Sequence, residues 1–277
     1  MRILILVTKM PEDGPLVSFG GLVAKLTQSS LTLLHVAPSK AKQERTDQVL
    51  NQAADLLAGL EVERRLCWGK PATMAILEMR QGNYDLIVIG ARQASTAMEQ
   101  SLSLASRAIL QRAPCSVLVV RGGSPQLQRV LICTAGTDLA EPVITAGAFL
   151  SRAAGAQVTL LHVAGTIPTM YTGLSEIEET LPELLKTDTP IARHLRRSAE
   201  LLASYQITAQ VELRHGLVTS EILREAHLSH IDLIILGSPS RGLRRWFLGD
   251  VALRVAENAP CSVLVVKGSL PVPSTSV

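Results

Sequence analysis

The residues with the clearest chemical potential form a segment rich in glycine, serine and arginine, which begins at Gly237 and ends before a predicted helix that starts near Val251. Its sequence is Gly-Ser-Pro-Ser-Arg-Gly-Leu-Arg-Arg-Trp-Phe-Leu-Gly-Asp. Glycines let a phosphate approach the backbone, serine hydroxyls can donate hydrogen bonds to it, and a helix amino terminus carries partial positive charge. The arginines add full charges. The segment therefore predicts a site for a phosphate or a related anion.

The predicted site also includes the ends of two other predicted strands, because ligands of open parallel sheets bind outside the carboxyl ends of the strands. We expect the phosphate to face the glycines, the serines and the amide of Val251, with Thr134 and Val163 near a base or sugar. The complete set of predicted binding residues is Thr134, Val163, Leu236, Gly237, Ser238, Ser240, Arg241, Gly249, Asp250 and Val251.

Asp250 complicates this prediction. A carboxylate at the start of the helix competes with a phosphate for the same amides, and the repulsion costs about 1 to 4 kcal/mol, depending on the effective dielectric. An aspartate directly before Val251 is also a good N-cap, and we interpret Asp250 mainly as that cap. Nearby arginines either offset the repulsion, pair with Asp250 or face solvent.

The segment lies in the second of two copies of one unit. The octapeptide Ala-Pro-Cys-Ser-Val-Leu-Val-Val occurs at residues 113–120 and again at 259–266. Two further pairs of segments match, 31–37 with 158–164 and 84–90 with 231–237. Each copy has the size of a domain, so the pattern indicates a duplication. We place the domains at residues 1–121 and 127–268.

An insertion distinguishes the second copy. The distance between matching segments grows by about twenty residues after Ala164, which places extra sequence at 165–190. Ser175 and Glu178 have capping-box spacing, and apolar residues share one helical face. These apolar residues are Ile177, Leu181, Leu184 and Leu185. The insertion is either a lid or contact surface, or a tolerated surface loop.

Short apolar runs alternate with longer helical patterns in both copies, which predicts parallel strands joined by crossover helices. Runs such as Leu86–Ile89 are apolar at every position, as in strands covered by helices on both faces. The predicted strands are 2–7, 31–36, 61–67, 85–89 and 116–120, then 129–133, 157–163, 208–214, 232–236 and 262–266. The fold class is therefore α/β, with two tandem five-stranded parallel domains related by a pseudo-two-fold axis.

The last strands of the two copies are identical and apolar, so each would be an exposed edge in an isolated domain. Antiparallel pairing of 117–120 with 263–266 would cover both edges at once. The pairing would also place Cys115 and Cys261 at opposite ends of the strands, too far apart for a disulfide.

Composition excludes several classes of protein. The net charge of +3 and an aromatic content of 3% give no indication of nucleic-acid binding. No apolar run approaches the length of a membrane span, and we expect no membrane partner and a cytoplasmic location. The four cysteines lack CxxC spacing, which favours reduced thiols over disulfides or metal ligands, and no metal site is predicted. A homodimer is compatible with the sequence.

Four features together resemble the universal stress protein family in its tandem form, over nearly the whole chain. They are the Leu-Leu-His-Val strand, the Asp-Leu-Ile-Ile-Leu-Gly-Ser strand end, the glycine-rich segment and the repeated octapeptide. The resemblance implies the strand order 3-2-1-4-5, pairing of the last strands of two domains and a link to stress survival without an agreed catalytic reaction. It also implies bound ATP in one branch of the family, whereas other branches do not bind nucleotide.

The ATP-binding branch has an Asp after the first strand, then Gly-x-x-Gly, nine residues, and Gly followed by Ser or Thr. In the first copy Lys9 stands where the Asp would be, and only Gly90 remains of the three glycines. A phosphate there would meet side chains instead of open backbone. We therefore predict that the first copy does not bind ATP in the manner of the family.

The second copy keeps more of the pattern. Ala135 replaces the Asp, Ser240 takes the second glycine position, and Asp250 replaces the final Ser or Thr after a spacer that is one residue short. We predict weak binding of ATP, AMP or a related anion in the second copy only.

Catalytic motifs are missing from the sequence. The start of a phosphate-binding P-loop at Gly237 lacks its lysine and hydroxyl, and we interpret His35 and His162 as packing or capping residues. No enzymatic activity is expected. Two functions remain open: a nucleotide-binding stress protein, and a scaffold that presents the insertion and the arginines to a protein or a small acidic ligand.

Overall fold

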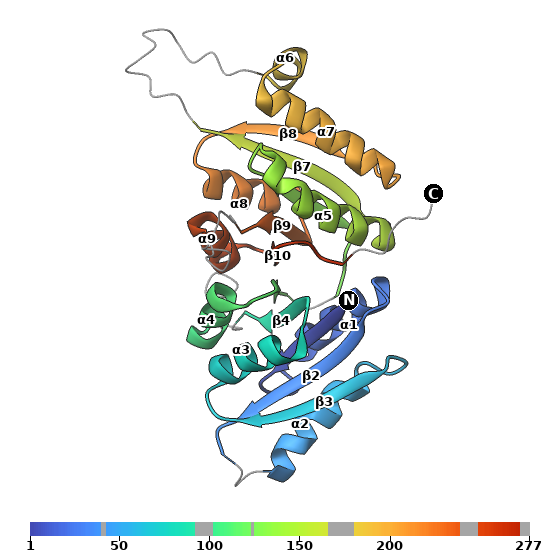
Figure 1. Cartoon of the computed structure of the whole chain (residues 1–277), viewed down its shortest axis with the longest axis vertical. Helices are drawn as coiled ribbons and strands as arrows, with labels where there is room; N and C mark the ends of the chain where they lie inside the picture. Colours follow the sequence, from blue (N-terminus) through green and yellow to red (C-terminus); the bar gives the residue numbers. More distant parts are fainter. Residues whose placement is uncertain (40–42, 92–101, 123–124, 166–179, 239–248, 272–277) are drawn as a thin grey trace.

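The computed structural model describes residues 1–39, 43–91, 102–122, 125–165, 180–238 and 249–271 (Figure 1). Strands and helices alternate throughout both copies. The first copy contains β1 (Arg2–Val7), α1 (Gly14–Leu26), β2 (Ser30–Ala37), α2 (Gln43–Asp55), β3 (Val62–Trp68), α3 (Pro71–Gly82), β4 (Leu86–Gly90), α4 (Leu104–Arg112) and β5 (Ser116–Val120).

The second copy repeats this order, with an additional helix between its second and third strands. It contains β6 (Arg129–Thr134), the 3₁₀ turn Asp138–Ala140, α5 (Glu141–Ala154), β7 (Gln157–Ala164), α6 (Leu181–Lys186), α7 (Pro190–Ser204), β8 (Gln210–His215), α8 (Val218–Leu228), β9 (Leu233–Gly237), α9 (Asp250–Asn258) and β10 (Ser262–Val266). The predicted strands are all present, with ends that shift by one or two residues.

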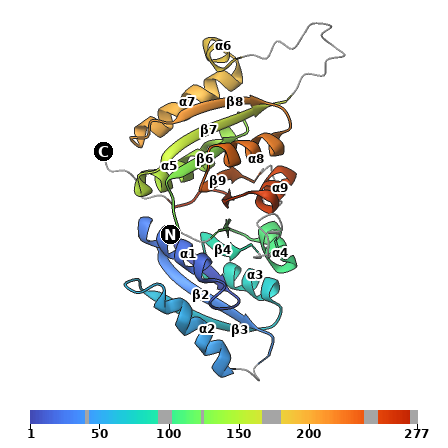
Figure 2. The ribbon, with the colours of Figure 1, turned by 180° about the vertical axis from the view of Figure 1, so that it is seen from behind.

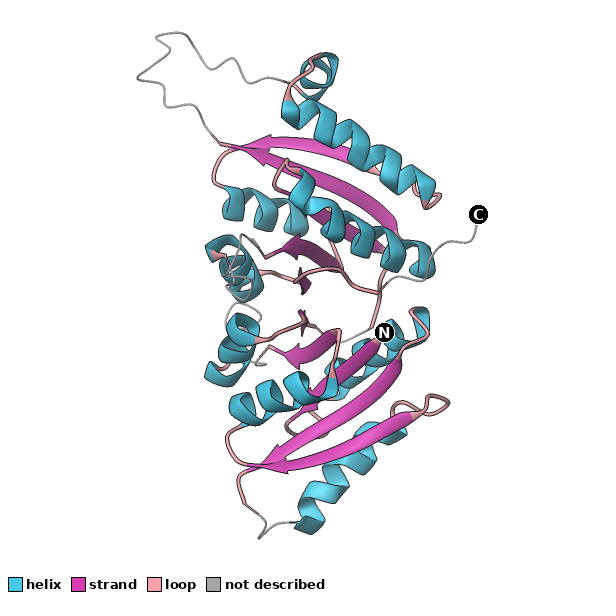
Figure 3. Cartoon of the chain, in the orientation of Figure 1, coloured by secondary structure: helices cyan, strands magenta, loops and turns pink. Residues whose placement is uncertain are grey.

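The strands form a single ten-stranded sheet in the order β3-β2-β1-β4-β5-β10-β9-β6-β7-β8 (Figure 3). Each half therefore has the order 3-2-1-4-5 that the resemblance implies. Neighbouring strands are parallel except at the centre, where β5 and β10 pair antiparallel and Leu118 lies opposite Leu264. The two apolar edge strands cover each other, as their sequences predict.

Helices cover both faces of this sheet (Figures 1 and 2). Alternate residues of β1 point to opposite faces, because side chains of a strand alternate. Ile3 and Ile5 belong to a buried layer that also contains residues of α1, α2, α5 and α7, whereas Leu4 and Leu6 belong to the layer that contains residues of α3, α4, α8 and α9. Both apolar layers contain residues of both copies, so the hydrophobic core continues across the duplication.

Two equivalent basic residues stabilise the junction between the copies. Arg121 follows β5 and donates to the carbonyls of Ala256 and Glu257 at the end of α9, both at 2.7 Å. Lys267 follows β10, and its Nζ donates to the carbonyls of Leu110 (2.8 Å) and Ala113 at the end of α4. Each copy thus caps the carboxyl end of a helix in the other, where a positive charge is favourable.

Each of the four cysteines is a free thiol, as their spacing predicts. Burial raises the pKa of Cys115 and of Cys261 to about 12. Both thiols therefore stay protonated near neutral pH. No described helix has both the length and the apolar character that crossing a membrane requires.

The described part of the insertion is α6, which begins later than predicted. Thr180 precedes the helix, and its backbone amide donates to the Glu183 carboxylate at 3.0 Å, so this pair forms the capping contact. The predicted pair Ser175 and Glu178, together with Ile177, lies outside the described residues. Leu184 is buried, as its place on the apolar face predicts.

Candidate functional site

A cavity of about 510 Å³ opens at the carboxyl ends of β6, β7 and β9, beside the amino end of α9. This position is where the strand order of the second copy reverses, with β6 between β7 and β9. Its volume lies in the range of small-molecule sites. The cavity therefore occupies the place where doubly wound sheets bind their ligands.

The structure brings the predicted residues together wherever it describes them. The predicted residues that line the cavity are Thr134, Val163, Leu236, Gly237, Ser238, Gly249, Asp250 and Val251. Ser240 and Arg241 were also predicted, and both lie outside the described residues.

The cavity has further walls that the sequence did not indicate as ligand-facing. Val218 and Ile222 come from α8, and Val143 comes from α5. Their positions follow from how these helices pack on the sheet, for which a local motif carries no signal. The remaining lining residues are Cys133, Ala135, Thr137, Leu139, Ala140, Leu161, His162 and Ala252.

Gly237 is required by this packing. A Cβ atom added at Gly237 would lie 2.8 Å from Cγ2 of Val143, closer than real Cβ atoms approach. At the equivalent Gly90 of the first copy the nearest atom would be Cδ2 of Leu16, at 3.8 Å. The second copy therefore needs glycine at the end of β9 to bring α5 against the cavity.

Thr134 is held at the cavity wall by a buried histidine of α7. The Oγ1 atom of Thr134 lies 2.6 Å from Nε2 of His194 and also accepts from the amide of Gly136 at 3.2 Å. His194 is 5% exposed. No sequence motif predicted a role for His194, because α7 and β6 are far apart along the chain and meet only in the folded protein.

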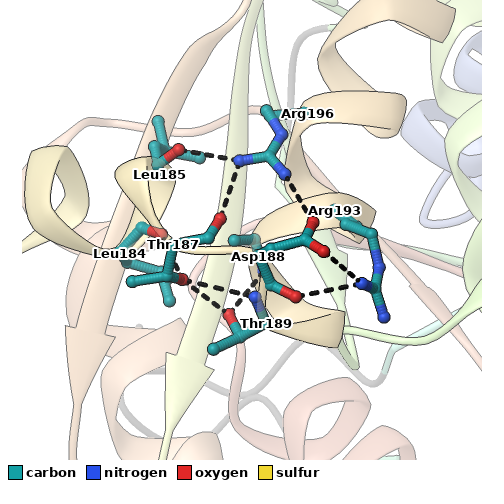
Figure 4. A network of polar contacts seen from close by, with 8 residues as sticks. Leu184, Leu185, Thr187, Asp188, Thr189, Arg193 and Arg196 are labelled. Atoms are coloured by element: carbon teal, nitrogen blue, oxygen red, sulfur yellow. Dashed lines mark hydrogen bonds and ion pairs between the residues drawn. The ribbon is translucent and has the colours of Figure 1, made fainter.

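Contacts at the start of α7 fix the position of this helix (Figure 4). Arg196 donates to the carbonyls of Leu185 at 2.7 Å and of Thr187 at 3.0 Å. Arg193 forms an ion pair with Asp188 at 2.8 Å. These contacts tie α6 to α7, so the described end of the insertion helps to place His194 against Thr134.

His162 and His35 fulfil the packing role that the sequence predicts. Nδ1 of His162 lies 3.1 Å from the carbonyl oxygen of Thr134, and Nδ1 of His35 lies 2.9 Å from that of Val7. Both histidines are buried. Each satisfies the carbonyl at the end of the first strand of its copy.

The position of Asp250 corrects one prediction. Gly249 is the N-cap, and Asp250 is the first residue of α9. In the first copy the equivalent cap is Ser103, whose Oγ accepts from the amide of Ser106 at 3.0 Å. Asp250 instead places its charge in the first helical turn, where it is favourable to the helix dipole but repels a bound phosphate.

The first copy fills the corresponding place with its own carboxylate. Asp13 accepts from the amides of Thr8 (2.6 Å) and Lys9 (2.9 Å), and from Oγ1 of Thr8 at 2.8 Å. These donors follow directly after β1. The carboxylate of Asp13 therefore accepts the hydrogen bonds of the amides that follow the first strand.

Strand register also corrects the alignment of the first copy. Val7 pairs with His35, and Thr134 pairs with the equivalent His162. Thr8 is therefore the counterpart of Ala135, whereas the prediction put Lys9 at the position equivalent to Ala135. The prediction failed because the segments after the two strands differ, so the sequence motif alone did not fix their alignment.

The thiol in the described wall of the cavity is not activated. Cys133 is the thiol in the wall, and burial raises its pKa well above the ordinary range. A protonated thiol is a poor nucleophile. Among the residues that the structure describes, no three histidine, cysteine or acidic side chains gather as a metal would require.

The described site fits a nucleotide in part. The amino end of α9, together with Gly237 and Gly249, provides open backbone, as phosphate binding requires. The carboxylate of Asp250 opposes that use. The fold and the site together define a tandem doubly wound α/β protein with a cavity at the strand ends of its second half.

Comparison with known proteins identifies the family. The sequence model of the universal stress protein family matches residues 1–121 and 126–267, so the chain belongs to that family. A universal stress protein of Methanocaldococcus jannaschii is 29% identical over 150 residues, which are 54% of this chain and 87% of the relative. That relative therefore corresponds to one copy. A universal stress protein of Bacillus subtilis is 25% identical over 50% of this chain and 98% of its own length.

Solved structures share the tandem fold. A putative universal stress protein from Pseudomonas aeruginosa superposes with a TM-score of 0.73 and 19% identity, and the match covers 96% of this chain and 92% of the other. One from Archaeoglobus fulgidus gives a TM-score of 0.72 at 18% identity, over 95% and 98% of the two chains. These similarities support the fold of both copies.

Proposed function

We propose that this universal stress protein is a non-catalytic regulatory protein of the cytoplasm that binds an adenine nucleotide, such as AMP or ATP, weakly in its second copy. The single observation that carries the proposal is the cavity at the carboxyl ends of β6, β7 and β9, which lies against the amino end of α9. A parallel sheet offers its ligand site at this position.

The contrast with the first copy supports one site per chain. Asp13 satisfies the amides after β1, so an incoming ligand would have to displace a hydrogen-bonded carboxylate there. In the second copy Ala135 lines the open cavity instead. Binding in the second copy avoids the cost of breaking those contacts.

The proposal is tested by isothermal titration of the full chain with AMP and ATP, with thermal shift as a second measurement. Ala135→Trp should fill the cavity and lower affinity by about tenfold or more, equivalent to about 1.4 kcal/mol. Thr8→Trp is the matched control at the equivalent position of the first copy, and it should change affinity by less than about twofold. Equal loss in both variants, or no binding by the unmodified chain, would contradict the proposal.

A scaffold function is the second candidate, and one surface feature favours it. Leu104 begins α4 and is 87% exposed, although the equivalent residue in the second copy is the charged Asp250. Exposed leucines are candidates for contacts with another protein or with a second copy of this chain. Light scattering over a range of concentrations tests this candidate: Leu104→Asp should abolish any dimer that the unmodified chain forms.

A further inference from the structure

Lys267 is held by the first copy at both ends of the residue. Its backbone amide donates to Oγ of Ser116 at 3.1 Å, and its Nζ donates to the carbonyls of Leu110 at 2.8 Å and of Ala113 at 3.1 Å. All three partners belong to the first copy, although Lys267 directly follows the last strand of the second. The backbone and the amine of this lysine thus link the two copies.

The two acceptors of the amine are carbonyl oxygens, which suit a neutral amine as well as an ammonium group. A neutral amine has two N–H groups, one for each carbonyl, and it keeps a lone pair. An ammonium group has a third N–H in place of that lone pair. The carbonyls of Leu110 and Ala113 therefore hold Nζ of Lys267 in place even when it carries its nucleophilic lone pair.

The surroundings of Lys267 favour the neutral form. Burial lowers the pKa of Lys267 to about 8, so about a quarter of the amine is neutral at about pH 7.5, against about one part in a thousand for an ordinary lysine. The ionisable group that acts on the amine from the elements packed against it is the thiol of Cys115, just before β5. This thiol is itself protonated and uncharged near neutral pH. Lys267 is nevertheless partly exposed, so a small molecule can reach it.

The equivalent residue of the first copy shows that the junction does not need an amine. Arg121 also donates to two carbonyls at the end of a helix in the other copy. A guanidinium group stays protonated in proteins and therefore has no nucleophilic lone pair to offer. The structural role is the same at the two positions, and Lys267 adds a chemical reactivity that Arg121 lacks.

From this arrangement we propose that Lys267 is a site of covalent acylation by a small acyl phosphate, and that the modification weakens the junction between the copies. The lone pair of the neutral Nζ attacks the acyl carbon and forms a C–N bond. The bond from the acyl carbon to the phosphate oxygen breaks, phosphate leaves, and the nitrogen releases one proton to water. The resulting amide has a single N–H, so the carbonyl of either Leu110 or Ala113 loses its donor. This modification does not depend on whether the cavity binds a nucleotide.

The reactivity is tested by treating the full chain with acetyl phosphate between about pH 7 and pH 10 and identifying the modified lysines by peptide mass spectrometry. At about pH 7.5 Lys267 should react about tenfold faster than Lys70, an exposed lysine of the first copy, because more of its amine is neutral. The rate at Lys267 should reach half of its maximum near pH 8, where the amine loses its proton. In concentrated urea, where the fold no longer buries the amine, Lys267 should react at the rate of Lys70.

The effect on the junction is tested by thermal unfolding of the acetylated protein. Acetylation of Lys267 should lower the melting temperature by about 2 to 4 °C, the effect expected for one unsatisfied carbonyl in a chain of this size. Lys267→Arg, treated in the same way, is the matched control, because it keeps the two donors and leaves the other lysines to react. Its melting temperature should change by less than about 1 °C.

Each outcome decides one part of the proposal. If Lys267 reacts no faster than Lys70, or keeps its advantage in urea, the folded junction does not activate the amine and the proposal is wrong. If Lys267 reacts fast but the melting temperature falls equally in the treated Lys267→Arg chain, the modification does not act on the junction. A fast reaction at Lys267 with a fall confined to the unmodified sequence supports both parts.

Discussion

The two copies share a sheet order and a repeated octapeptide, yet they treat the end of their first strand differently. In the first copy Asp13 folds back and accepts three hydrogen bonds from Thr8 and Lys9. In the second copy the chain after β6 lines an open cavity. A duplicated fold can therefore keep its architecture while one half covers the end of its first strand with a side chain of its own.

The start of the last helix differs in the same sense. The first copy has Ser103 as a capping side chain followed by Leu104, whereas the second has Gly249 followed by Asp250. A glycine cap leaves the helix amides open to a ligand, but the next residue brings a negative charge. The start of α9 in the second copy thus combines an open backbone with a negative charge in the first turn.

The largest expected effect on stability comes from Asp13. Asp13→Ala removes a charged acceptor from the amides of Thr8 and Lys9, and should lower the free energy of unfolding by about 2 kcal/mol, since hydrogen bonds to a charged group contribute more than neutral ones. Urea unfolding measures the change. Glu12→Ala is the control, because its exposed ion pair with Lys9 should contribute little to stability.

An equal loss in the two variants would mean that the carboxylate of Asp13 has no special role. The contrast between a closed and an open first-strand end would then rest on backbone shape alone.

A glycine pair gives the next largest effect. Gly237→Ala should destabilise the protein by about 1 to 2 kcal/mol, because the new methyl group meets Val143, a buried and branched side chain. Gly90→Ala at the equivalent position meets only ordinary contacts and should be neutral, or stabilise by a few tenths of a kcal/mol. Thermal unfolding of both variants tests the difference, and similar melting temperatures would show that α5 does not pack more tightly than α1.

Lys267, the counterpart of Arg121, gives the smallest expected effect, which is a change in the free energy of unfolding with pH. Burial lowers the pKa of Lys267 from 10.5 to about 8. Below pH 8 this lysine is charged in both the folded and the unfolded state, and the folded state bears the full cost of burying the charge. Above pH 8 the folded protein releases the proton first, so the unfolded chain binds more protons and stability rises with pH.

The buried thiols act in the opposite direction at higher pH. The pKa values of Cys115 and Cys261 rise from 9.0 to about 12 on folding, so stability falls as pH rises above 9. Burial raises the pKa of Cys133 as well, so we expect a maximum of stability between pH 8 and 9, with a gain of less than about 1 kcal/mol above pH 8 because Lys267 is only partly buried. Lys267→Arg keeps the charge and should abolish the gain. Urea unfolding at several pH values measures it, and a gain that persists in this variant would refute the assignment to Lys267.

Local sequence patterns were enough to predict most of the fold. The repeat, the fully apolar runs such as Leu233–Leu236 and the identical last strands were enough to predict the two copies, their strands and the antiparallel junction of β5 with β10. They also predicted part of the cavity wall, since strand ends and glycines at helix starts are local features. Thr134, Gly237 and Gly249 line the cavity.

The predictions failed where a residue's role depends on a partner distant in sequence or on the path of a loop. Asp250 has a side chain that is favoured at N-cap positions, but the helix begins one residue earlier than expected and Gly249 is the cap. The contacts of Asp13 and the true counterpart of Ala135 were missed for the same reason, because the chain after β1 follows its own course.

The sequence by itself thus determined a duplicated α/β chain and the edge of the sheet at which a ligand would bind, because strand period, glycine spacing and internal identity are written locally. Only the tertiary structure decided which residues from distant parts of the chain form the wall of the cavity in the second copy. His194 reaches Thr134 from a helix 60 residues away, and Val218 and Ile222 join the wall from α8. Such contacts depend on how helices pack across a sheet, which no short segment of sequence specifies.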